Sequence, residues 1–195
     1  MRLYGASGHA KVIIGILRLL KYKISKIYDD NAPFQLLGSD VVHFDNDYNG
    51  DFIISIGNNK ARKKIAQELV NASFGNAIHP TAIIDETVSI DEGTVVMAGV
   101  VINPSTKIGK HCIINTSASI DHDCSIENYC HISPNTTLSG TVKIGEGTQI
   151  GAGAVVIPNI TIGKWATIGA GAVVIKDVPD NATVVGNPGR IISVK

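Results

Sequence analysis

The sequence predicts a small α/β domain over residues 1–77, followed by a parallel β-helix over residues 78–195. The first observation is a period of six. Every sixth position from Ile78 to Val174 is Ile, Val or Leu, which makes 17 positions without a slip in register. This period fits neither an α-helix nor a simple alternating strand, and it is typical of stacked hexapeptide coils. The second observation is an alternation of strand-length and helix-length apolar segments before residue 77.

A second position in each hexad supports the β-helix. Four residues after each aliphatic residue stands a small or β-branched residue, beginning with Ala82 and ending with Ala172. One large and one small inward residue per hexad suit a narrow prism with tight corners. Three hexads make a coil of 18 residues, so residues 18 apart should stack at the strand spacing of roughly 4.8 Å. Stacked coils bury a continuous core that no single repeat can bury alone.

The outward positions just before each aliphatic residue sort into three walls. One wall is polar throughout: Ser89, Lys107, Ser125, Lys143 and Thr161. The other two contain apolar residues, Ile83 and Val101 on one wall, Val95 and Ile113 on the other. Apolar side chains that face outward indicate that these two walls meet neighbours, so we expect an oligomer.

The first 77 residues resemble a small parallel sheet of Rossmann type. A strand at residues 3–4 ends in a turn at residues 5–8, which opens a helix, and a second strand at residues 24–28 ends at Asp29 and Asp30. Further strands are expected at residues 41–44 and 52–56, and a second helix near residues 61–70. Backbone N–H groups at the start of a helix can hold phosphate, and an acidic pair can accept hydrogen bonds from a ribose or base. The turn has only two glycines, so the full dinucleotide motif is missing.

Composition excludes several classes of protein. The chain has 17 basic and 17 acidic residues and no basic block, which argues against nucleic-acid binding. The longest apolar run near the N-terminus, residues 12–20, contains Arg18 and is too short to span a bilayer. With no signal peptide, we expect a cytoplasmic protein without membrane insertion. The three cysteines occupy small inward positions and form no Cys-x-x-Cys pair, so they are expected in the core and not on zinc.

Several motifs occur together over nearly the whole chain. They are Gly-Ala-Ser-Gly-His-Ala-Lys-Val at the first turn, Asp29-Asp30, Ile56-Gly57-Asn58-Asn59 with Arg62, the hexads, and Gly186-Asn187-Pro188-Gly189-Arg190. The combination resembles the sugar acyltransferases of the sialic-acid O-acetyltransferase and UDP-N-acetylbacillosamine N-acetyltransferase family. The resemblance implies a left-handed β-helix, a homotrimer, acetyl-CoA bound between subunits, and a nucleotide-linked sugar bound by the N-terminal domain.

The activity implied by this resemblance is acetyl-CoA-dependent N-acetylation. The implied acceptor is the 4-amino group of a nucleotide-linked amino-dideoxy sugar in bacterial glycan synthesis, with UDP favoured over GDP. Two other functions stay open: O-acetylation of sialic acid or another surface sugar, and non-catalytic nucleotide-sugar binding. A carbonic-anhydrase-like zinc enzyme does not fit, because His111, His122 and His131 are spaced 11 and 9 residues apart. No metal is therefore predicted.

His122 is the candidate catalytic base. It stands between Asp121 and Asp123 in a turn after an inward aliphatic residue. A carboxylate that hydrogen-bonds an imidazole fixes its tautomer and raises its basicity, and acetyl transfer needs a base for the acceptor's proton. From the residues alone, a solvated surface histidine between two acids is equally open. By resemblance, His122 matches the family's base and Asp123 its acidic partner.

The resemblance also implies binding residues. The candidates for the sugar nucleotide are Gly5, Ser7, Gly8, His9, Asp29, Asp30, Asn58, Asn59 and Asn115. The candidates for acetyl-CoA are His131, Gly140, Ala152, Ala170, Lys176 and Arg190. Among these, His131 is expected near the thioester, and Gly140 is expected to turn its backbone N–H toward the thioester carbonyl. A glycine at that position permits close approach of the backbone.

Overall fold

The N-terminal region is a five-stranded sheet flanked by two helices. The computed structural model describes residues 1–194 of the chain. The sheet has the order β3-β4-β2-β1-β5, parallel except for β3 at the edge. Its strands are β1 (Arg2–Tyr4), β2 (Lys26–Tyr28), β3 (Phe34–Leu36), β4 (Ser39–Val42) and β5 (Phe52–Ile54). The helices are α1 (Gly8–Leu19), which follows β1, and α2 (Asn59–Glu68), which follows β5.

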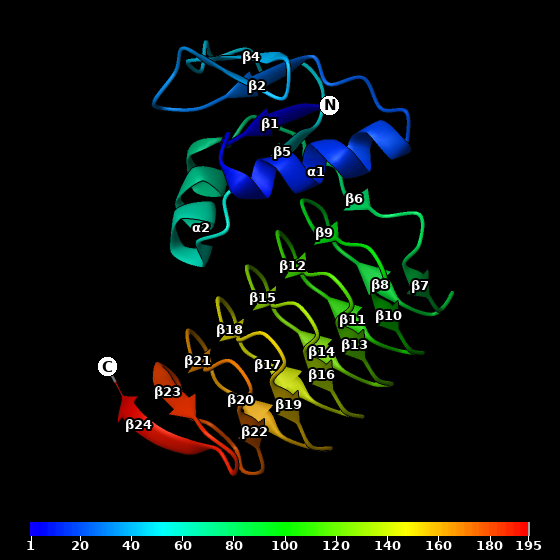
Figure 1. Cartoon of the computed structure of the whole chain (residues 1–195), viewed down its shortest axis with the longest axis vertical. Coiled ribbons are helices and arrows are strands. Elements are labelled where there is room, and N and C mark those ends of the chain that lie inside the picture. Colours follow the sequence, from blue (N-terminus) through cyan, green and yellow to red (C-terminus); the bar gives the residue numbers. More distant parts are fainter. Residues whose placement is uncertain (195) are drawn as a thin grey trace.

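The rest of the chain is a parallel β-helix with three walls (Figure 1). The six-stranded wall contains β7 (Ile83–Ile84), β10 (Val101–Ile102), β13 (Ser119–Ile120), β16 (Thr137–Leu138), β19 (Val155–Val156) and β22 (Val173–Val174). The five-stranded wall contains β8 (Ser89–Ile90), β11 (Lys107–Ile108), β14 (Ser125–Ile126), β17 (Lys143–Ile144) and β20 (Thr161–Ile162). The eight-stranded wall contains β6 (Ala77–Ile78), β9 (Val95–Val96), β12 (Ile113–Ile114), β15 (His131–Ile132), β18 (Gln149–Ile150), β21 (Thr167–Ile168), β23 (Ala182–Val185) and β24 (Arg190–Val194).

The register confirms the predicted coil of 18 residues. Ile102 pairs with Ile120, and Ile114 pairs with Ile132. The aliphatic and small inward positions form one continuous buried core from coil to coil. The buried threonines at the small position have hydrogen-bond partners, because each hydroxyl donates to a backbone carbonyl, as Thr106 does to Asp121 at 2.8 Å. The chain ends in the antiparallel hairpin of β23 and β24, which completes the eight-stranded wall.

The N-terminal domain covers the apolar residues of the eight-stranded wall in the coils next to it, whereas Ile191 and Ile192 of β24 stay exposed. Val95 and Ile113 belong to one buried cluster with Ile13 and Leu17 of α1. Figure 1 shows α1 lying across the top of the prism and α2 beside the eight-stranded wall. The neighbour of Val95 and Ile113 is therefore an element of the same chain. The six-stranded wall stays uncovered, with Ile83 68 % exposed.

Two further expectations concern the chain as a whole. No helix within residues 1–194 is long and apolar enough to cross a membrane. The division into domains at residue 77 stays a prediction, with β6 as the first strand of the prism.

Candidate active site

His122 lies at the corner between β13 and β14, held by carboxylates on both sides. Its Nδ1 is 2.8 Å from Asp123 Oδ2, and its backbone N–H donates to Asp121 Oδ1 at 2.9 Å. Asp121 in turn accepts a hydrogen bond from Asn103 at 2.9 Å. The hydrogen bond with Asp123, followed by the charge of Asp121, raises the pKa of His122 above its ordinary value of 6.5. With Nδ1 directed at a carboxylate, Nε2 is the nitrogen free to accept a proton.

Gly140 lies one coil later and directly against the His122 ring. A Cβ placed on Gly140 would come within 2.7 Å of Cε1 and 2.8 Å of Nε2 of His122. Any side chain at position 140 would therefore displace the imidazole. The Gly140 N–H has no acceptor within the described part of the chain, so it is available to an incoming oxygen. His122, Asp123 and Gly140 thus form one group.

His131 projects from β15 into the junction with the N-terminal domain. Its Nε2 lies 3.0 Å from Asn115 Nδ2. Burial first, then the charges of Arg62 and His9, lower the pKa of His131 to about 4. The ring is therefore neutral near pH 7, and Nε2 accepts a hydrogen bond from the Asn115 amide. Asn115 and His131, both predicted ligands, act as one pair.

His9 lies in the first turn of α1 and approaches the same junction. Its Nε2 is buried and has no hydrogen-bond partner within residues 1–194. Burial, with a smaller effect of the Arg62 charge, lowers the pKa of His9 to about 4. An orphaned ring nitrogen is costly unless something binds it. This fits the predicted role of His9 in substrate binding.

The turn at residues 5–8 has the shape that phosphate binding needs. Gly5 has φ +104°, and a Cβ there would lie 2.6 Å from Ile56, so glycine is required. Ser7 is the N-cap of α1, but its side chain makes no capping hydrogen bond. Ser7 and Gly8 are exposed. The first N–H groups of α1 are thus open to a ligand.

The acidic pair after β2 is tied to this turn. Asp29 Oδ2 accepts from the Ala6 N–H at 2.8 Å, and Asp30 Oδ1 accepts from the Tyr4 hydroxyl at 3.0 Å. Burial opposes ionisation of Asp29, but hydrogen bonds from Asn31 and Ala6 outweigh it and keep its pKa below the ordinary value. Asp29 therefore positions the turn, while Asp30 is the more exposed member of the pair.

Asn58 and Asn59 lie together but are used differently. Asn58 caps α2 by accepting from the Ala61 N–H at 2.9 Å, and its side chain is exposed. Asn59 is buried: its Nδ2 donates to the Gly147 carbonyl at 3.0 Å, and its Oδ1 accepts from Arg62 at 2.8 Å. Both polar groups of the Asn59 side chain are thus occupied within the protein. Substrate contact by Asn59, expected from the sequence, stays a prediction.

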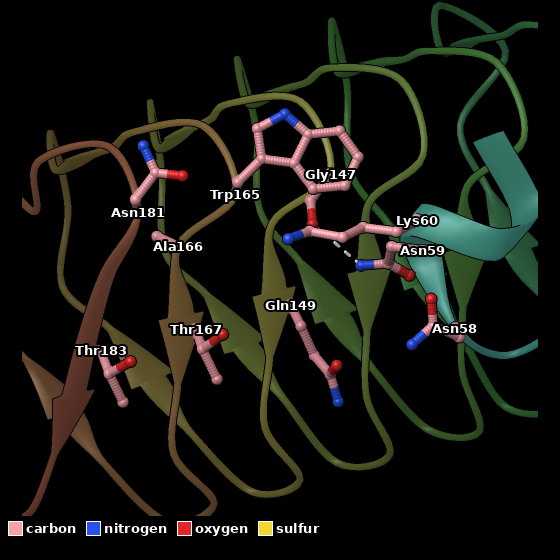
Figure 2. Close-up of a pocket in the computed structure, with 10 residues that line it drawn as sticks. All are labelled: Asn58, Asn59, Lys60, Gly147, Gln149, Trp165, Ala166, Thr167, Asn181 and Thr183. Atoms are coloured by element: carbon pink, nitrogen blue, oxygen red, sulfur yellow. Dashed lines mark hydrogen bonds between the residues drawn. The ribbon is translucent and has the colours of Figure 1, made fainter. Parts of the chain in front are cut away.

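A polar cavity of about 220 Å³ lies where α2 meets the eight-stranded wall. Figure 2 shows its lining residues: Asn58, Asn59, Lys60, Gly147, Gln149, Trp165, Ala166, Thr167, Asn181 and Thr183. The Nζ atom of Lys60 is 5.9 Å from the centroid of the Trp165 ring. None of these lining residues is acidic. Lys60 and Trp165 could not be predicted from the sequence, because they are far apart in the chain and belong to no shared motif.

The remaining acetyl-CoA candidates lie toward the C-terminal end. Ala152 and Ala170 are exposed at the same corner, one coil apart. Lys176 and Arg190 line a cavity of about 310 Å³ next to the C-terminal hairpin. The structure therefore brings these two cations together, although 14 residues separate them in the sequence.

The described chain holds its candidates in two groups. The His122 group occupies the corner that follows β13, whereas Asn115 occupies the corner that precedes β13. The six-stranded wall lies between these corners. A single chain does not bring the His122 group onto the Asn115–His131 pair.

Comparison with known proteins gives consistent results. The model of the PglD N-terminal domain matches residues 2–69, and the model of the bacterial transferase hexapeptide matches residues 105–140 and 141–176. Comparison with curated proteins gave no significant match.

Several solved structures are similar over almost the full chain. GDP-perosamine N-acetyltransferase from Caulobacter crescentus, in complex with CoA and GDP-perosamine, is 38% identical with a TM-score of 0.95, and the match covers 98% of this chain and 96% of that one. The acetyltransferase domain of PglB from Neisseria gonorrhoeae, in complex with acetyl coenzyme A, is 33% identical with a TM-score of 0.92, covering 98% of each chain. WeeI from Acinetobacter baumannii is 30% identical with a TM-score of 0.92 and the same coverage.

Proposed function

The chain belongs to the hexapeptide-repeat sugar acetyltransferases with a PglD-type N-terminal domain, and we propose that it acetylates a nucleotide-linked amino sugar. Acetyl-CoA is the donor, and the acceptor is the amino group of the sugar. The observation that carries the proposal is the His122–Asp123 pair at 2.8 Å, with Gly140 against the free edge of the ring. Similar proteins bind the matching ligands: CoA with GDP-perosamine in one, acetyl coenzyme A in another.

The pair supplies the proton transfer that acetylation needs. The amine nitrogen attacks the thioester carbonyl carbon, while His122 Nε2 takes the proton that the nitrogen loses. Asp123 stabilises the imidazolium, since its carboxylate already accepts the Nδ1 proton. The negative charge on the carbonyl oxygen is met by the free N–H of Gly140. The C–S bond then breaks, and the proton on Nε2 passes to the sulfur of CoA.

The N-terminal domain supplies the binding site for the sugar nucleotide. The turn at residues 5–8 presents free helix N–H groups to the diphosphate. Asp30, two residues after β2, is exposed and is the proposed contact to the nucleoside. Asn58 lines the cavity between α2 and the prism, and the unpartnered Nε2 of His9 within residues 1–194 is the proposed contact to the sugar. We retain a UDP-linked 4-amino sugar as the expected acceptor, and the GDP-perosamine bound by the Caulobacter enzyme is its main competitor.

The separation of the two groups leads us to propose a homotrimer with each site between subunits. The six-stranded wall is uncovered and has Ile83 68 % exposed. Its edges hold the His122 group and the Asn115–His131 pair. A second copy packed on this wall would bring His122 of one chain to His131 of the next. Size-exclusion chromatography with light scattering tests this, and a stable monomer at micromolar concentration would contradict it.

A mixing experiment tests the shared site more directly. Two variants that each remove one group, His122→Ala and His131→Ala, would be unfolded together and refolded as a mixture, and each variant refolded alone is the reference. If each site takes one group from each of two chains, the mixed oligomer contains sites with both groups intact, and its kcat/KM exceeds the average of the two variants. A mixture that forms mixed oligomers but does not exceed that average would show that one chain supplies both groups.

The first assay of function is CoA release from acetyl-CoA with three separate acceptors: a UDP-linked 4-amino sugar, GDP-perosamine and free sialic acid. Turnover with one amino-sugar nucleotide would support N-acetylation and identify the nucleotide. Turnover with sialic acid alone would transfer the assignment to O-acetylation. No turnover with any of them would contradict the proposed acceptor class.

We also propose a cytoplasmic location, consistent with three unpaired, buried cysteines within the described residues.

A further inference from the structure

Arg62 is the most deeply buried charged side chain at the junction of the two domains. It is 1 % exposed and comes from α2. Its guanidinium donates to the carbonyls of His111 at 2.7 Å, Ile56 at 3.0 Å and Tyr129 at 2.9 Å. It also donates to the Gly57 and Cys130 carbonyls and to the Asn59 side chain. All acceptors are neutral, and Arg62 forms no salt bridge within residues 1–194.

These acceptors belong to both halves of the proposed active site. Ile56 and Gly57 form the loop that leads to Asn58, next to the proposed site of the sugar nucleotide. Tyr129 and Cys130 directly precede His131, which the acetyl-CoA assignment places near the thioester. The guanidinium is planar and holds its donors in a fixed fork. It therefore fixes the distance and angle between the loop and the strand.

Its charge also acts on the histidines around it. Burial lowers the pKa of Arg62 to about 10, so the guanidinium stays protonated near neutral pH. The titratable groups that act on His131 are Arg62 from α2 and His9 from α1. Ile113 and Gln149, its neighbours on adjacent strands, carry no charge. A cation without a counter-ion disfavours a second positive charge beside it, so Arg62 favours the neutral form of His131.

We propose that Arg62 is a positioning residue of the acetyl transfer: it locks the loop at residues 56–58 to the strand of His131, so that acceptor and thioester meet in a reactive geometry. This inference rests on the proposed function and deepens it. Arg62 touches neither substrate in this assignment, because its donors are all used within the protein. Its effect is therefore expected on the rate of the bound complex, not on the affinity for either ligand.

The test compares Arg62→Lys and Arg62→Met with the wild type and with Lys64→Met, a matched control on α2. Lys64 is 75 % exposed, and among residues 1–194 its one ion pair is with Glu68. Lysine keeps the charge, but a single nitrogen cannot reach the carbonyls on both sides. We expect kcat to fall by about 10- to 100-fold in both Arg62 variants, because a small misplacement of the reacting groups lowers the rate by a factor of this size. The dissociation constants of acetyl-CoA and of the sugar nucleotide, each measured alone by calorimetry, should not change.

A wild-type kcat in the Lys variant would overturn the proposal. So would a loss of rate that matches an equal loss of affinity for each ligand alone, since that pattern indicates general disorder. Thermal unfolding of each variant gives the folded fraction by which kcat is corrected. If Arg62→Met does not fold, the Lys variant alone decides.

A second readout does not depend on turnover. In ¹⁵N-histidine NMR titrations, Arg62→Met should raise the pKa of His131, whereas Arg62→Lys and Lys64→Met should leave it unchanged. An unchanged pKa of His131 in a folded Met variant would show that Arg62 does not act on it. If the wild type turns over none of the acceptors, the proposed function fails, and the titration still tests the link between Arg62 and His131.

Discussion

The two histidines of the proposed site have opposite surroundings, although only nine residues separate them in the sequence. His122 is 56 % exposed and lies beside two carboxylates, which raise its pKa. His131 lies in the domain junction, where burial and the Arg62 charge lower its pKa to about 4. The imidazole of His122 is therefore suited to accept a proton, whereas the imidazole of His131 is suited to act as a neutral hydrogen-bond partner.

This contrast shows that a position on the prism does not by itself determine the pKa or the role of a histidine. Both residues face outward from the prism, His122 from a corner against Gly140 of the next coil and His131 from a strand in register with Ile113 and Gln149. What differs is the neighbour: aspartates from the same corner for His122, and helices from another domain for His131. Each of the following experiments changes one neighbour or one histidine, in the order of the effect expected.

The largest effect is expected from His122→Ala. Removal of a general base costs about 10²- to 10⁴-fold in rate, so kcat/KM in the CoA-release assay should fall by that factor. His43→Ala is the control, because His43 is exposed and lies in the N-terminal domain. Activity near the wild-type level in the His122 variant would remove this residue from the mechanism.

The next effect is expected from Gly140→Ala. The new methyl group would occupy the place of His122 Cε1 and Nε2, so the ring must move while Asp121 and Asp123 remain. We expect kcat to fall by about 10- to 100-fold, as for other small displacements of a catalytic group. Gly15→Ala is the control, since a Cβ at Gly15 meets nothing within 4 Å. An unchanged kcat would mean that the ring position seen here is not the active one.

Asp123→Asn should change the pH dependence of the reaction. His122 must be neutral to act, so kcat/KM falls as pH drops through its pKa, which lies above 6.5. The hydrogen bond with Asp123 is the first cause of the raised pKa, so the variant should have a lower maximum and an acid limb displaced to lower pH. Asparagine tolerates the φ of +59° at this position. The pH profile of kcat/KM is the measurement, and a limb that stays in place would show that another group titrates.

The smallest effect is expected from His131→Gln. Glutamine keeps an acceptor for the Asn115 amide, and the native ring is already neutral throughout the assay range because its pKa is about 4. Because that hydrogen bond is kept, we expect KM for acetyl-CoA to rise by no more than the about 2- to 10-fold that one neutral hydrogen bond is worth, while the acid limb of the pH profile stays in place. A displaced acid limb would contradict the division of roles between the two histidines.

Much of the prism and of the His122 group follows from sequence spacing. A period of six with three hexads per coil places residues 18 apart side by side, so the contact of Gly140 with His122 follows from the numbers alone. Ala152 and Ala170 share a corner for the same reason. The hydrogen bond between His122 and Asp123 joins neighbours in the chain, and a local motif is sufficient to predict it.

The contacts between the two domains could not be predicted from the sequence. Arg62 reaches Tyr129, and Asn59 reaches Gly147, across 67 and 88 residues of chain. No period connects α2 with a particular coil, because the docking depends on how two complete surfaces fit together. The Trp165 cavity was missed for the same reason.

The apolar residues of the eight-stranded wall show most clearly where sequence reasoning ends. The alternation of inward and outward positions determined that Val95 and Ile113 face out of the prism and need a cover. Only the tertiary structure decided that the cover is α1 of the same chain and not a second subunit. The physical reason is that burial of apolar surface gains nearly the same free energy against any apolar partner. Pattern therefore predicts that a surface is covered, whereas shape and chain connectivity determine what covers it.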